Sequence, residues 1–577
     1  MVMNEFEADE IFGELNRKFA NVSLEQATQD DVYHEITFSD LFTYRDTIEC
    51  SSNYQACYSA MRNIRRYLTQ NISYERIQNV FDLGIQDKIR NILQEPGYDE
   101  LKYETAWTIT NLAYGSSEQT QILIDTGIID ALIQCFRSCD SYRVKSQAAW
   151  ALANVSIESP RYRESMAQEN LIGDIAQALG QKCDTITSSG QYKRSDKGCI
   201  IVENKADRDD VKDLTWSLAN ICRGGFKTAE HWEQYLHAFD AFSKCVSFEN
   251  VDIWSEACWG LSRVLSNMYN YEPFFQSLNL NPELCPRLIH LLRHQEMSML
   301  LPVLQTISNF SSGPNEYIEI LLDADLLSNI WWYMTPDTQH QLRRNAILTI
   351  SNLAAGNQQI VREVVYSENI MQSVIAHILI PGHIYRADEC SWVPSAHSVL
   401  PLEKEEWRIV KEVLFVLSNI TTLASDDSVC ALLRDYSSII KLLSALLQYP
   451  QLLTAVSLKV VDVLIRIVDR TNQISEVTPT PQNPYAEEML REGVIPALVY
   501  LCQQSQSSEL IEQSEILQMA ITCHSSAAPV SAVDSANAFG LSRHGIHLPG
   551  PNIRRIVKGY EDGDVRFIED AINSIQL

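Results

Sequence analysis

A tryptophan followed four residues later by an asparagine occurs three times in this chain, and the spacing of these pairs constrains the fold more than any other feature. The pairs stand in the segments ETAWTITNL, AAWALANVS and LTWSLANIC, as Trp107 with Asn111, Trp150 with Asn154, and Trp216 with Asn220. Trp107 and Trp150 are 43 residues apart, and Trp216 is again 43 residues from Trp259. A recurring interval of this length indicates a chain built from stacked repeats.

The same frame continues with other residues at the marker positions. Asparagine recurs downstream, and the tryptophan position changes, in the combinations Gln305 with Asn309, Leu348 with Asn352, and Phe415 with Asn419. Each unit also carries two further apolar segments at helical spacing, separated in several units by a glycine (Gly84, Gly127, Gly493) that ends the first helix. A helical unit of about 42 residues lies in the armadillo and HEAT range. We therefore expect an all-α superhelical solenoid of about ten helical repeats over residues 50–525, of the armadillo or the HEAT kind.

Other segments lie outside this periodic pattern. Residues 1–49 form an acidic N-terminal segment, and residues 526–577 form a C-terminal tail with serine and alanine runs. Polar insertions lengthen the interval between markers at about 183–210 and about 380–405. Because such segments usually run over the surface, we expect the 183–210 insertion to be a mobile loop.

The composition limits the classes of partner. The formal net charge of −28 speaks against direct nucleic-acid binding and favours basic partners, although an acidic surface also simply keeps a protein soluble. The 14 cysteines include no CxxC pair, so we expect buried thiols in a reducing compartment. The N-terminus lacks the pattern of a secretory signal, and no apolar run reaches the roughly 20 residues of a membrane span. We expect an intracellular, soluble protein that does not associate with membranes.

The sequence gives little support for an enzyme. It contains no HExxH, no GxSxG and no phosphate-binding loop with GK[ST]. His290 and His294 in HLLRH are spaced as a possible ligand pair, but no third ligand follows from the spacing, and we interpret them as a solvated helix face. We expect no catalytic residue, no metal and no cofactor.

The Trp–Asn ladder, meaning the three pairs named first, suits an extended basic peptide. Residues i and i+4 share one helix face, so Trp and Asn would stand side by side once per repeat. An asparagine amide can bind both the N–H and the C=O of a peptide, and indole rings can shelter the stems of Lys or Arg. Three residues before each marker the same face holds mostly acids, in the set Glu104, Gln147, Asp213, Glu256 and Glu412. The plain alternative is that each Trp is core and each Asn is solvated, but the repeated register favours the ladder.

These residues resemble importin alpha, the armadillo-repeat receptor for nuclear localisation signals, over roughly residues 50–520. The segments that carry the resemblance are ETAWTITNLAYGSSEQTQILIDTGIIDALI, QAAWALANVS, DLTWSLANICRGG and SEACWGLSRVLSN, the last with Arg263 in place of asparagine. The resemblance implies an all-α armadillo-repeat right-handed superhelical solenoid of about ten three-helix repeats. It also implies a concave groove with two peptide sites. The larger site comprises Trp107, Asn111, Gly115, Thr120, Gln147, Trp150, Asn154, Glu158, Asp213, Trp216, Asn220, Glu256 and Trp259. Within it, the family's lysine-selecting pocket maps onto Gly115, Thr120 and Glu158, where the family has aspartate at the last position.

The smaller site departs from the family pattern. The family uses two tryptophans and an arginine there, where this chain has Leu348, Phe415 and Gln305. The remaining members of this site are Asn309, Asn352, Asn419 and Glu412. We expect weak or absent binding at the smaller site, and hence a preference for signals with one basic cluster.

The N-terminal segment also departs from the family, which begins with an arginine-rich segment that binds importin-beta. Residues 1–49 contain only Arg17, Lys18 and Arg45 as basic residues, so we expect no self-inhibition and no importin-beta binding of the usual kind. The expected function is binding of proteins that carry basic nuclear localisation signals, as an import receptor or adaptor in cytoplasm and nucleus. The alternative is an armadillo scaffold that binds another extended basic partner.

Overall fold

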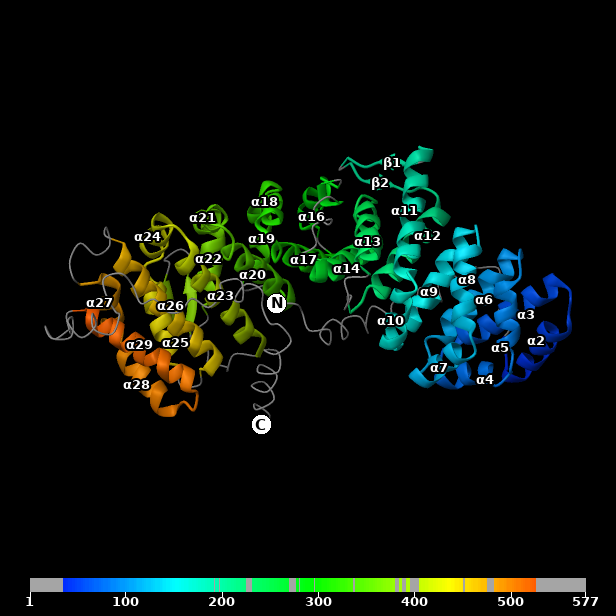
Figure 1. Ribbon diagram of the computed structural model, residues 1–577, viewed down its shortest axis with the longest axis horizontal. Coiled ribbons are helices and arrows are strands. Elements are labelled where there is room, and N and C mark those ends of the chain that lie inside the picture. Colours follow the sequence, from blue (N-terminus) through cyan, green and yellow to red (C-terminus); the bar gives the residue numbers. More distant parts are fainter. Residues whose placement is uncertain are drawn as a thin grey trace. The chain divides into compact units, whose positions relative to one another are not determined.

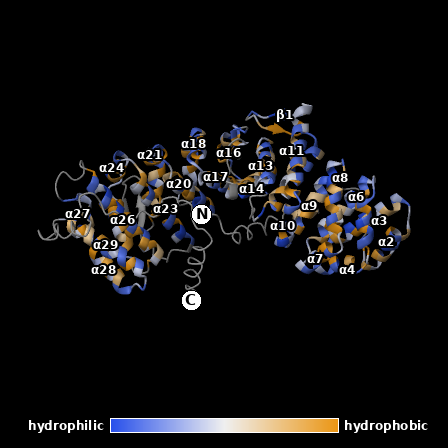
Figure 2. Ribbon diagram, in the orientation of Figure 1, coloured by the Kyte–Doolittle hydropathy of each residue, from blue (hydrophilic) through white to orange (hydrophobic). Residues whose placement is uncertain are grey.

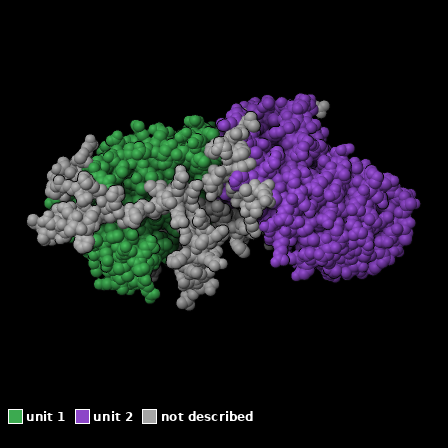
Figure 3. Space-filling view, viewed as in Figure 1, with its two compact units in different colours: residues 1, 289–295, 307–577 green, residues 2–288, 296–306 purple. Residues whose placement is uncertain are grey.

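The chain forms two compact, almost entirely helical units (Figures 1 and 3). The computed structural model describes residues 35–525, with gaps at 191, 197, 225–230, 269–276, 280, 295, 336–337, 379–382, 387–390, 395–403, 450–451 and 475–481. The N-terminal unit comprises residues 2–288 and 296–306, and the C-terminal unit comprises residue 1, 289–295 and 307–577. In the described part, no helix combines the length and apolar character needed to cross a membrane.

The helices of the N-terminal unit follow the order that the repeat pattern predicts. A first pair is α2 (Phe38–Cys50) and α3 (Tyr54–Gln70). Groups of three follow, namely α4 (Tyr74–Phe81), α5 (Gln86–Gln94) and α6 (Asp99–Leu112); α7 (Ser117–Asp125), α8 (Ile128–Ser138) and α9 (Tyr142–Glu158); α10 (Pro160–Gln168), α11 (Leu171–Ser189) and α12 (Lys205–Ile221). The next helices are α13 (Trp232–Cys245), α14 (Val251–Met268), α16 (Leu284–Leu291) and α17 (Met297–Ser311), the last two being divided between the units.

The C-terminal unit continues the same grouping. Its helices are α18 (Asn315–Asp323), α19 (Leu326–Ile330), the 3-10 helix η2 (Trp331–Met334) and α20 (His340–Ala354); α21 (Gln358–Tyr366), α22 (Glu368–Ala376) and α23 (Lys404–Leu423); α24 (Asp426–Asp435), α25 (Ile439–Leu447) and α26 (Thr454–Gln473); α27 (Pro484–Arg491), α28 (Val494–Gln504) and α29 (Ser508–His524). This arrangement confirms the all-α armadillo prediction.

The last helix of each group, called the marker helix, packs against the marker helices of neighbouring groups. In the N-terminal unit these are α3, α6, α9, α12 and α14, and in the C-terminal unit α20, α23, α26 and α29. With neighbours on both sides and its own group behind it, a marker helix is buried nearly all round: in α6 every residue from Leu101 to Leu112 except Tyr103 is buried. Hydrophobic residues accordingly recur along the helices of both units (Figure 2). Each group therefore depends on its neighbours for a core.

The turn between the first two helices of a group needs a left-handed residue. The glycines expected there adopt positive φ: Gly84 at 75°, Gly127 at 69° and Gly493 at 79°. Asn170 (63°) and Asp325 (68°) take this role before α11 and α19. Asn and Asp are the side chains that tolerate this conformation best, which explains why the repeat continues where its glycine is missing.

The prediction that residues 183–210 form a mobile loop is wrong for most of that segment. Helix α11 continues to Ser189, and α12 already begins at Lys205. Between them, β1 (Lys193–Arg194) pairs with β2 (Ile200–Ile201) in an antiparallel hairpin, and Ile200 also bonds to the backbone at Ser247 and Glu249. The physical reason is apolar periodicity, because Leu179, Cys183 and Ile186 keep one face of α11 buried.

The other boundaries also differ from the sequence expectation. Helix α2 lies within the segment 1–49 and packs on α3, so helical structure begins before residue 50. In the 380–405 insertion, β3 (His383–Arg386) pairs antiparallel with β4 (Ser391–Pro394), and α23 begins at Lys404. The tail 526–577 lies outside the described residues, as do residues 1–34.

Candidate functional site

The three Trp–Asn pairs lie on the adjacent marker helices α6, α9 and α12. Their indole rings are largely buried, since Trp107 is 7% exposed, Trp150 9% and Trp216 4%. Trp259 on α14 is buried in the same way. The register expected from the sequence is therefore present, but only a small part of each ring reaches the surface.

Trp150 and Trp216 contact each other directly. Their ring centroids are 5.6 Å apart, and the ring planes are inclined by 55°. An aliphatic chain between two parallel rings requires the planes to be about 7 Å apart, because each carbon–carbon contact takes about 3.5–4 Å. The slot that we expected between these indoles is thus closed in this structure, and a basic side chain could enter it only after one ring turned.

Trp107 carries a cation from the chain itself. The guanidinium carbon of Arg65, on α3, lies 3.9 Å from the centroid of the Trp107 ring. The Nε atom of Arg65 donates to Oε2 of Glu104 at 2.6 Å, and both side chains are buried. Glu104 is the acid three residues before the marker, so Arg65 occupies both groups that were expected to receive a basic peptide side chain.

Of the ladder asparagines, Asn154 links neighbouring repeats and Asn220 bonds within its own helix. Asn154 Nδ2 donates to the Thr110 carbonyl on α6 at 3.1 Å, and Gln147 Nε2 donates to Thr110 Oγ1 at 2.8 Å. Asn220 Nδ2 donates to the Trp216 carbonyl of its own helix at 2.9 Å. These amides therefore use some of their hydrogen-bond donors for contacts within the fold.

The same position links repeats even where asparagine is replaced. Arg263 on α14 donates to the Ala219 carbonyl on α12, just as Asn154 on α9 donates to α6 two repeats earlier. This structural role was missed from the sequence. Its signal was present, because Arg263 is the one non-asparagine at this position in the first four markers, and a long donor can replace an amide in reaching a neighbouring carbonyl.

Several residues of the predicted larger site carry a buried polar atom without a hydrogen-bond partner in the described part of the protein. They include Asn111 Nδ2, Thr120 Oγ1, Asn220 Oδ1 and Glu256 Oε2. Such atoms are uncommon in folded proteins, because each costs about 1–3 kcal/mol when buried without a partner. Donors and acceptors are both represented, as a peptide backbone would require.

The acids of the predicted site are held in surroundings that favour their neutral forms. Burial raises the pKa of Asp213 to about 8; Lys212 opposes the shift, while Asp209 and Asp210 add to it. Burial likewise raises the pKa of Glu256 and of Glu158. A cation placed beside these carboxyl groups would reverse the shift and favour the ionised form.

The three residues of the predicted lysine pocket lie around the start of α7 and the end of α9. Gly115 is buried, and its N–H donates to the Leu112 carbonyl at 3.1 Å. Thr120 is 1% exposed in the first half of α7, whereas Glu158 is exposed as the last residue of α9. No hydrogen bond joins Glu158 to Thr120 among the described residues, so this pocket stays a prediction.

In the C-terminal unit the asparagines again link marker helices. Asn352 Nδ2 donates to the Ser308 carbonyl at 3.2 Å, and Asn419 Nδ2 donates to the Ser351 carbonyl at 3.2 Å. Leu348 is 8% exposed, and burial raises the pKa of Glu412. The remaining predicted members of the smaller site, Gln305 and Asn309, are buried.

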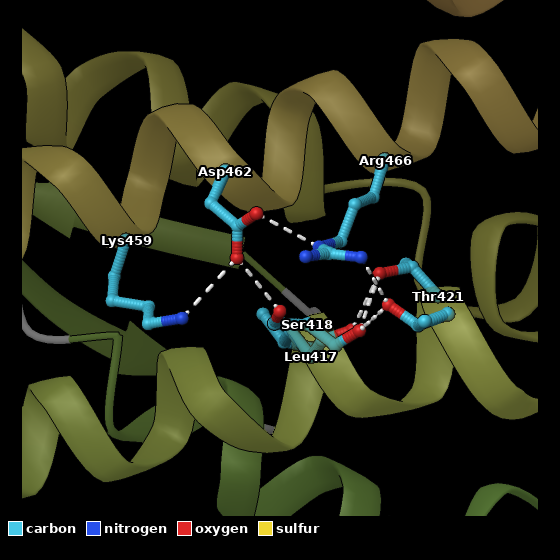
Figure 4. A network of polar contacts seen from close by, with 7 residues as sticks. Leu417, Ser418, Thr421, Lys459, Asp462 and Arg466 are labelled. Carbon is cyan, nitrogen blue, oxygen red and sulfur yellow. Dashed lines mark hydrogen bonds and ion pairs between the residues drawn. The ribbon is translucent and has the colours of Figure 1, made fainter. Parts of the chain in front are cut away.

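Charged side chains of α26 form a cluster that also involves Ser418 of α23 (Figure 4). Lys459 Nζ lies 4.3 Å from the centroid of the Phe415 ring. Asp462 connects the members of this cluster. It forms ion pairs with Lys459 at 3.3 Å and with Arg466 at 2.8 Å, and it accepts a hydrogen bond from Ser418 at 2.8 Å. The face of Phe415 is thus occupied by a cation of the chain itself.

Comparison with known proteins agrees with this repeat architecture. The family model described as Armadillo/beta-catenin-like repeat matches residues 116–157, which span α7, α8 and almost all of α9. The crystal structure of an engineered protein, at 17% identity, superposes with a TM-score of 0.62 and covers 84% of this chain and 98% of its own. At that identity the likeness concerns the fold alone.

Two importin alpha subunits from plants are similar in sequence to this chain. Importin subunit alpha-1a of Oryza sativa subsp. japonica is 27% identical over 297 residues, covering 51% of each chain. Importin subunit alpha-3 of Arabidopsis thaliana is 27% identical over 259 residues, covering 44% of this chain and 42% of its own. The chain spans about half the length of the curated relatives it matches. The chain thus has a helical repeat fold that matches the armadillo model at residues 116–157, and its sequence is similar to those of importin alpha subunits.

Proposed function

We propose that the N-terminal unit binds extended basic peptides of the nuclear localisation class along α6, α9 and α12. In this proposal the protein acts as a nuclear import receptor or adaptor that moves between cytoplasm and nucleus. The proposal rests on one observation above all. The buried atoms Asn111 Nδ2, Thr120 Oγ1 and Asn220 Oδ1, which have no partner among the described residues, belong to residues that the sequence pattern predicts to contact a peptide.

A peptide backbone is chemically suited to these atoms. Asn111 offers a donor that a peptide carbonyl can accept from, and Asn220 offers an acceptor for a peptide N–H. Binding would replace two unsatisfied groups by two hydrogen bonds, which gains more than a bond between groups already solvated by water. The two asparagines contact backbone, so this part of the interaction would be independent of the peptide's sequence.

Selectivity for basic side chains comes from the acids. Asp213 and Glu256 stand three residues before Trp216 and Trp259, and their carboxyl groups are held in surroundings that disfavour a lone negative charge. A lysine or arginine beside them supplies the missing counter-charge. The net charge of −28 would also speed the encounter with a basic partner.

A second candidate function is favoured by the contact between Trp150 and Trp216. If this closed arrangement persists in solution, the protein is an armadillo scaffold that binds another extended basic partner elsewhere on its surface. Preservation of the unpartnered asparagine atoms speaks for the first candidate, and the closed slot speaks for the second.

Fluorescence anisotropy of a labelled lysine-rich localisation peptide tests the proposal. We expect binding that weakens with salt, and loss of most of it in the Asn111→Ala and Asn220→Ala variants. Asn352→Ala is the matched control from the C-terminal unit, because the Asn352 amide already donates to Ser308 and Ser311 of that same unit. Since Asn111 Nδ2 has no partner among the described residues, Asn111→Ala should leave the free energy of unfolding nearly unchanged. An absence of peptide binding at low salt would favour the scaffold.

The same titration, repeated with importin-beta, tests the carrier. Residues 1–49 contain three basic residues, which are too few to imitate the family's arginine-rich segment. We therefore propose that importin-beta leaves the peptide affinity unchanged, and that another carrier or none serves this protein. A tenfold change in peptide affinity on adding importin-beta would contradict that proposal.

A further inference from the structure

We infer that Arg65 is a specificity-determining residue, a resident cation that fills the first cation position of the ladder and confines basic ligands to the positions from Trp150 onward. This inference rests on the proposed function. It concerns how many basic residues the N-terminal unit can accept, and not whether it accepts any.

The geometry of Arg65 reproduces what a peptide arginine would do at this position. Its guanidinium lies over the Trp107 face at 3.9 Å, within the range of a cation–π contact. Its Nε donates to Glu104 at 2.6 Å, the length of a charge-assisted hydrogen bond. A peptide cation would need the same ring face and the same carboxylate, so it and Arg65 exclude each other.

The other acids at the same register position differ from Glu104. Asp213 and Glu256 make no ion pair with any residue that the structure describes, whereas Glu104 is paired and 4% exposed. Trp107 likewise carries the Arg65 guanidinium over its ring, whereas the Trp150 ring packs on the Trp216 ring. The first position is therefore filled by an ion pair from within the chain, while Asp213 and Glu256 lack such a pair and Glu256 Oε2 has no hydrogen-bond partner among the described residues.

The C-terminal unit contains the same arrangement independently. Lys459, on the marker helix next to that of Phe415, lies over the Phe415 ring and pairs with Asp462. In both units a cation from a neighbouring marker helix covers an aromatic marker and is held by a carboxylate. Because the arrangement occurs twice, on different helices, we infer that cations of the chain itself close the aromatic positions where a ligand cation could bind.

The inference predicts how affinity depends on peptide length. With Arg65 in place, lengthening a three-lysine cluster to five lysines adds charge but no new cation position. Without Arg65, Trp107 and Glu104 become available, and the five-lysine peptide gains a specific contact. We therefore compare the ratio of the two dissociation constants between variants.

The experiment uses full-length protein and two labelled peptides, with three or five consecutive lysines in an alanine–glycine frame. Arg65→Gln removes the resident cation. Arg66→Gln is the matched control, because it removes the same charge from the adjacent residue of α3, whose guanidinium donates to Asn63 of the same helix. Arg65→Gln together with Glu104→Gln opens the ring without leaving an unpaired buried carboxylate, and it serves if the single variant does not fold.

We expect Arg65→Gln to raise the preference for the five-lysine peptide by about three- to thirtyfold over wild type, the strength of one cation–π contact. Arg66→Gln should leave the ratio at the wild-type value, and the double variant should raise it by a smaller factor of about two to five. Equal ratios in all folded variants, with the three-lysine peptide still bound, would overturn the inference alone. If no protein binds either peptide, the proposed function is wrong and the inference is overturned with it.

Discussion

The two units carry the same asparagine ladder on different marker residues. In the N-terminal unit the markers are tryptophans, and buried polar atoms beside them lack partners. In the C-terminal unit the markers are Leu348 and Phe415, and charges from α26 lie over the aromatic ring. Asn154, Asn352 and Asn419 donate to the preceding marker helix in either unit. The asparagine position therefore serves the fold, and the difference between the units lies in what surrounds it.

The largest expected effect concerns the burial of the markers. Trp216 is 4% exposed and packs on Trp150, so Trp216→Ala should lower the free energy of unfolding by about 4 kcal/mol. Phe415 is only half-buried, so Phe415→Ala should cost about 2 kcal/mol or less. Urea unfolding followed by circular dichroism measures both. Equal costs would mean that the markers of the two units are equivalent as core residues.

This burial also decides how binding should be tested at the tryptophans. Alanine variants of Trp150 and Trp216 test folding, because they leave a cavity between packed helices. Phenylalanine keeps an apolar ring with a π face, so Trp150→Phe and Trp216→Phe are the variants that isolate the peptide contact. A phenylalanine variant that folds and binds normally would exclude the indole from ligand selection.

The second prediction compares the resident cations. Arg65 and Glu104 have side chains 8% and 5% exposed, so Glu104→Ala leaves a buried charge unpaired and should cost about 3 kcal/mol of folding stability. Lys459 and Asp462 are 21% and 22% exposed, so Asp462→Ala should cost about 1 kcal/mol or less. Thermal unfolding of both variants at low and high salt measures this, and only the second pair should be sensitive to salt. If Asp462→Ala cost more folding stability than Glu104→Ala, the distinction between the buried Arg65–Glu104 pair and the solvated Lys459–Asp462 pair would be wrong.

The sequence predicted the repeat, the helix order and the ladder register, because these depend on periodic apolar residues and on spacing within a helix. It also located the glycine turns, and it missed Asn170 and Asp325 in the same role because only their backbone conformation reveals it. The 183–210 insertion was misread, since its polar composition concealed the buried face of α11.

Side-chain partners could not be predicted from spacing. Arg65 reaches Glu104 across 39 residues of sequence, and Lys459 reaches Phe415 across 44. Such contacts depend on which helix packs next to which, and on the rotamers of long side chains. The closed slot between Trp150 and Trp216 is of the same kind, because it depends on ring orientation and not on register.

The third prediction uses pH to separate the acids of the N-terminal unit. The pKa of free Asp213 is about 8, so the carboxyl group is mostly protonated at pH 6. A lysine favours the ionised form, so binding releases a proton, and affinity should rise by about tenfold from pH 6 to pH 8 and level off above. Anisotropy titrations at constant ionic strength measure this. Asp213→Asn should remove part of the rise and leave the part due to Glu256, whose pKa burial raises to about 7. An unchanged slope in that variant would exclude Asp213 as a responsible group.

The smallest expected effect concerns the second peptide cluster. Leu348 lacks a π face, and the Phe415 face is covered by Lys459, so the C-terminal unit offers little to a second basic cluster. Removing the smaller cluster from a two-cluster signal should therefore change the affinity by less than about threefold, which corresponds to less than about 0.7 kcal/mol. A peptide with its small cluster replaced by alanines, compared with the intact signal, gives the measurement. A loss of tenfold or more would show that the retained asparagines alone suffice for a second site, and the contrast between the two units would then lie in selectivity for side chains and not in peptide binding itself.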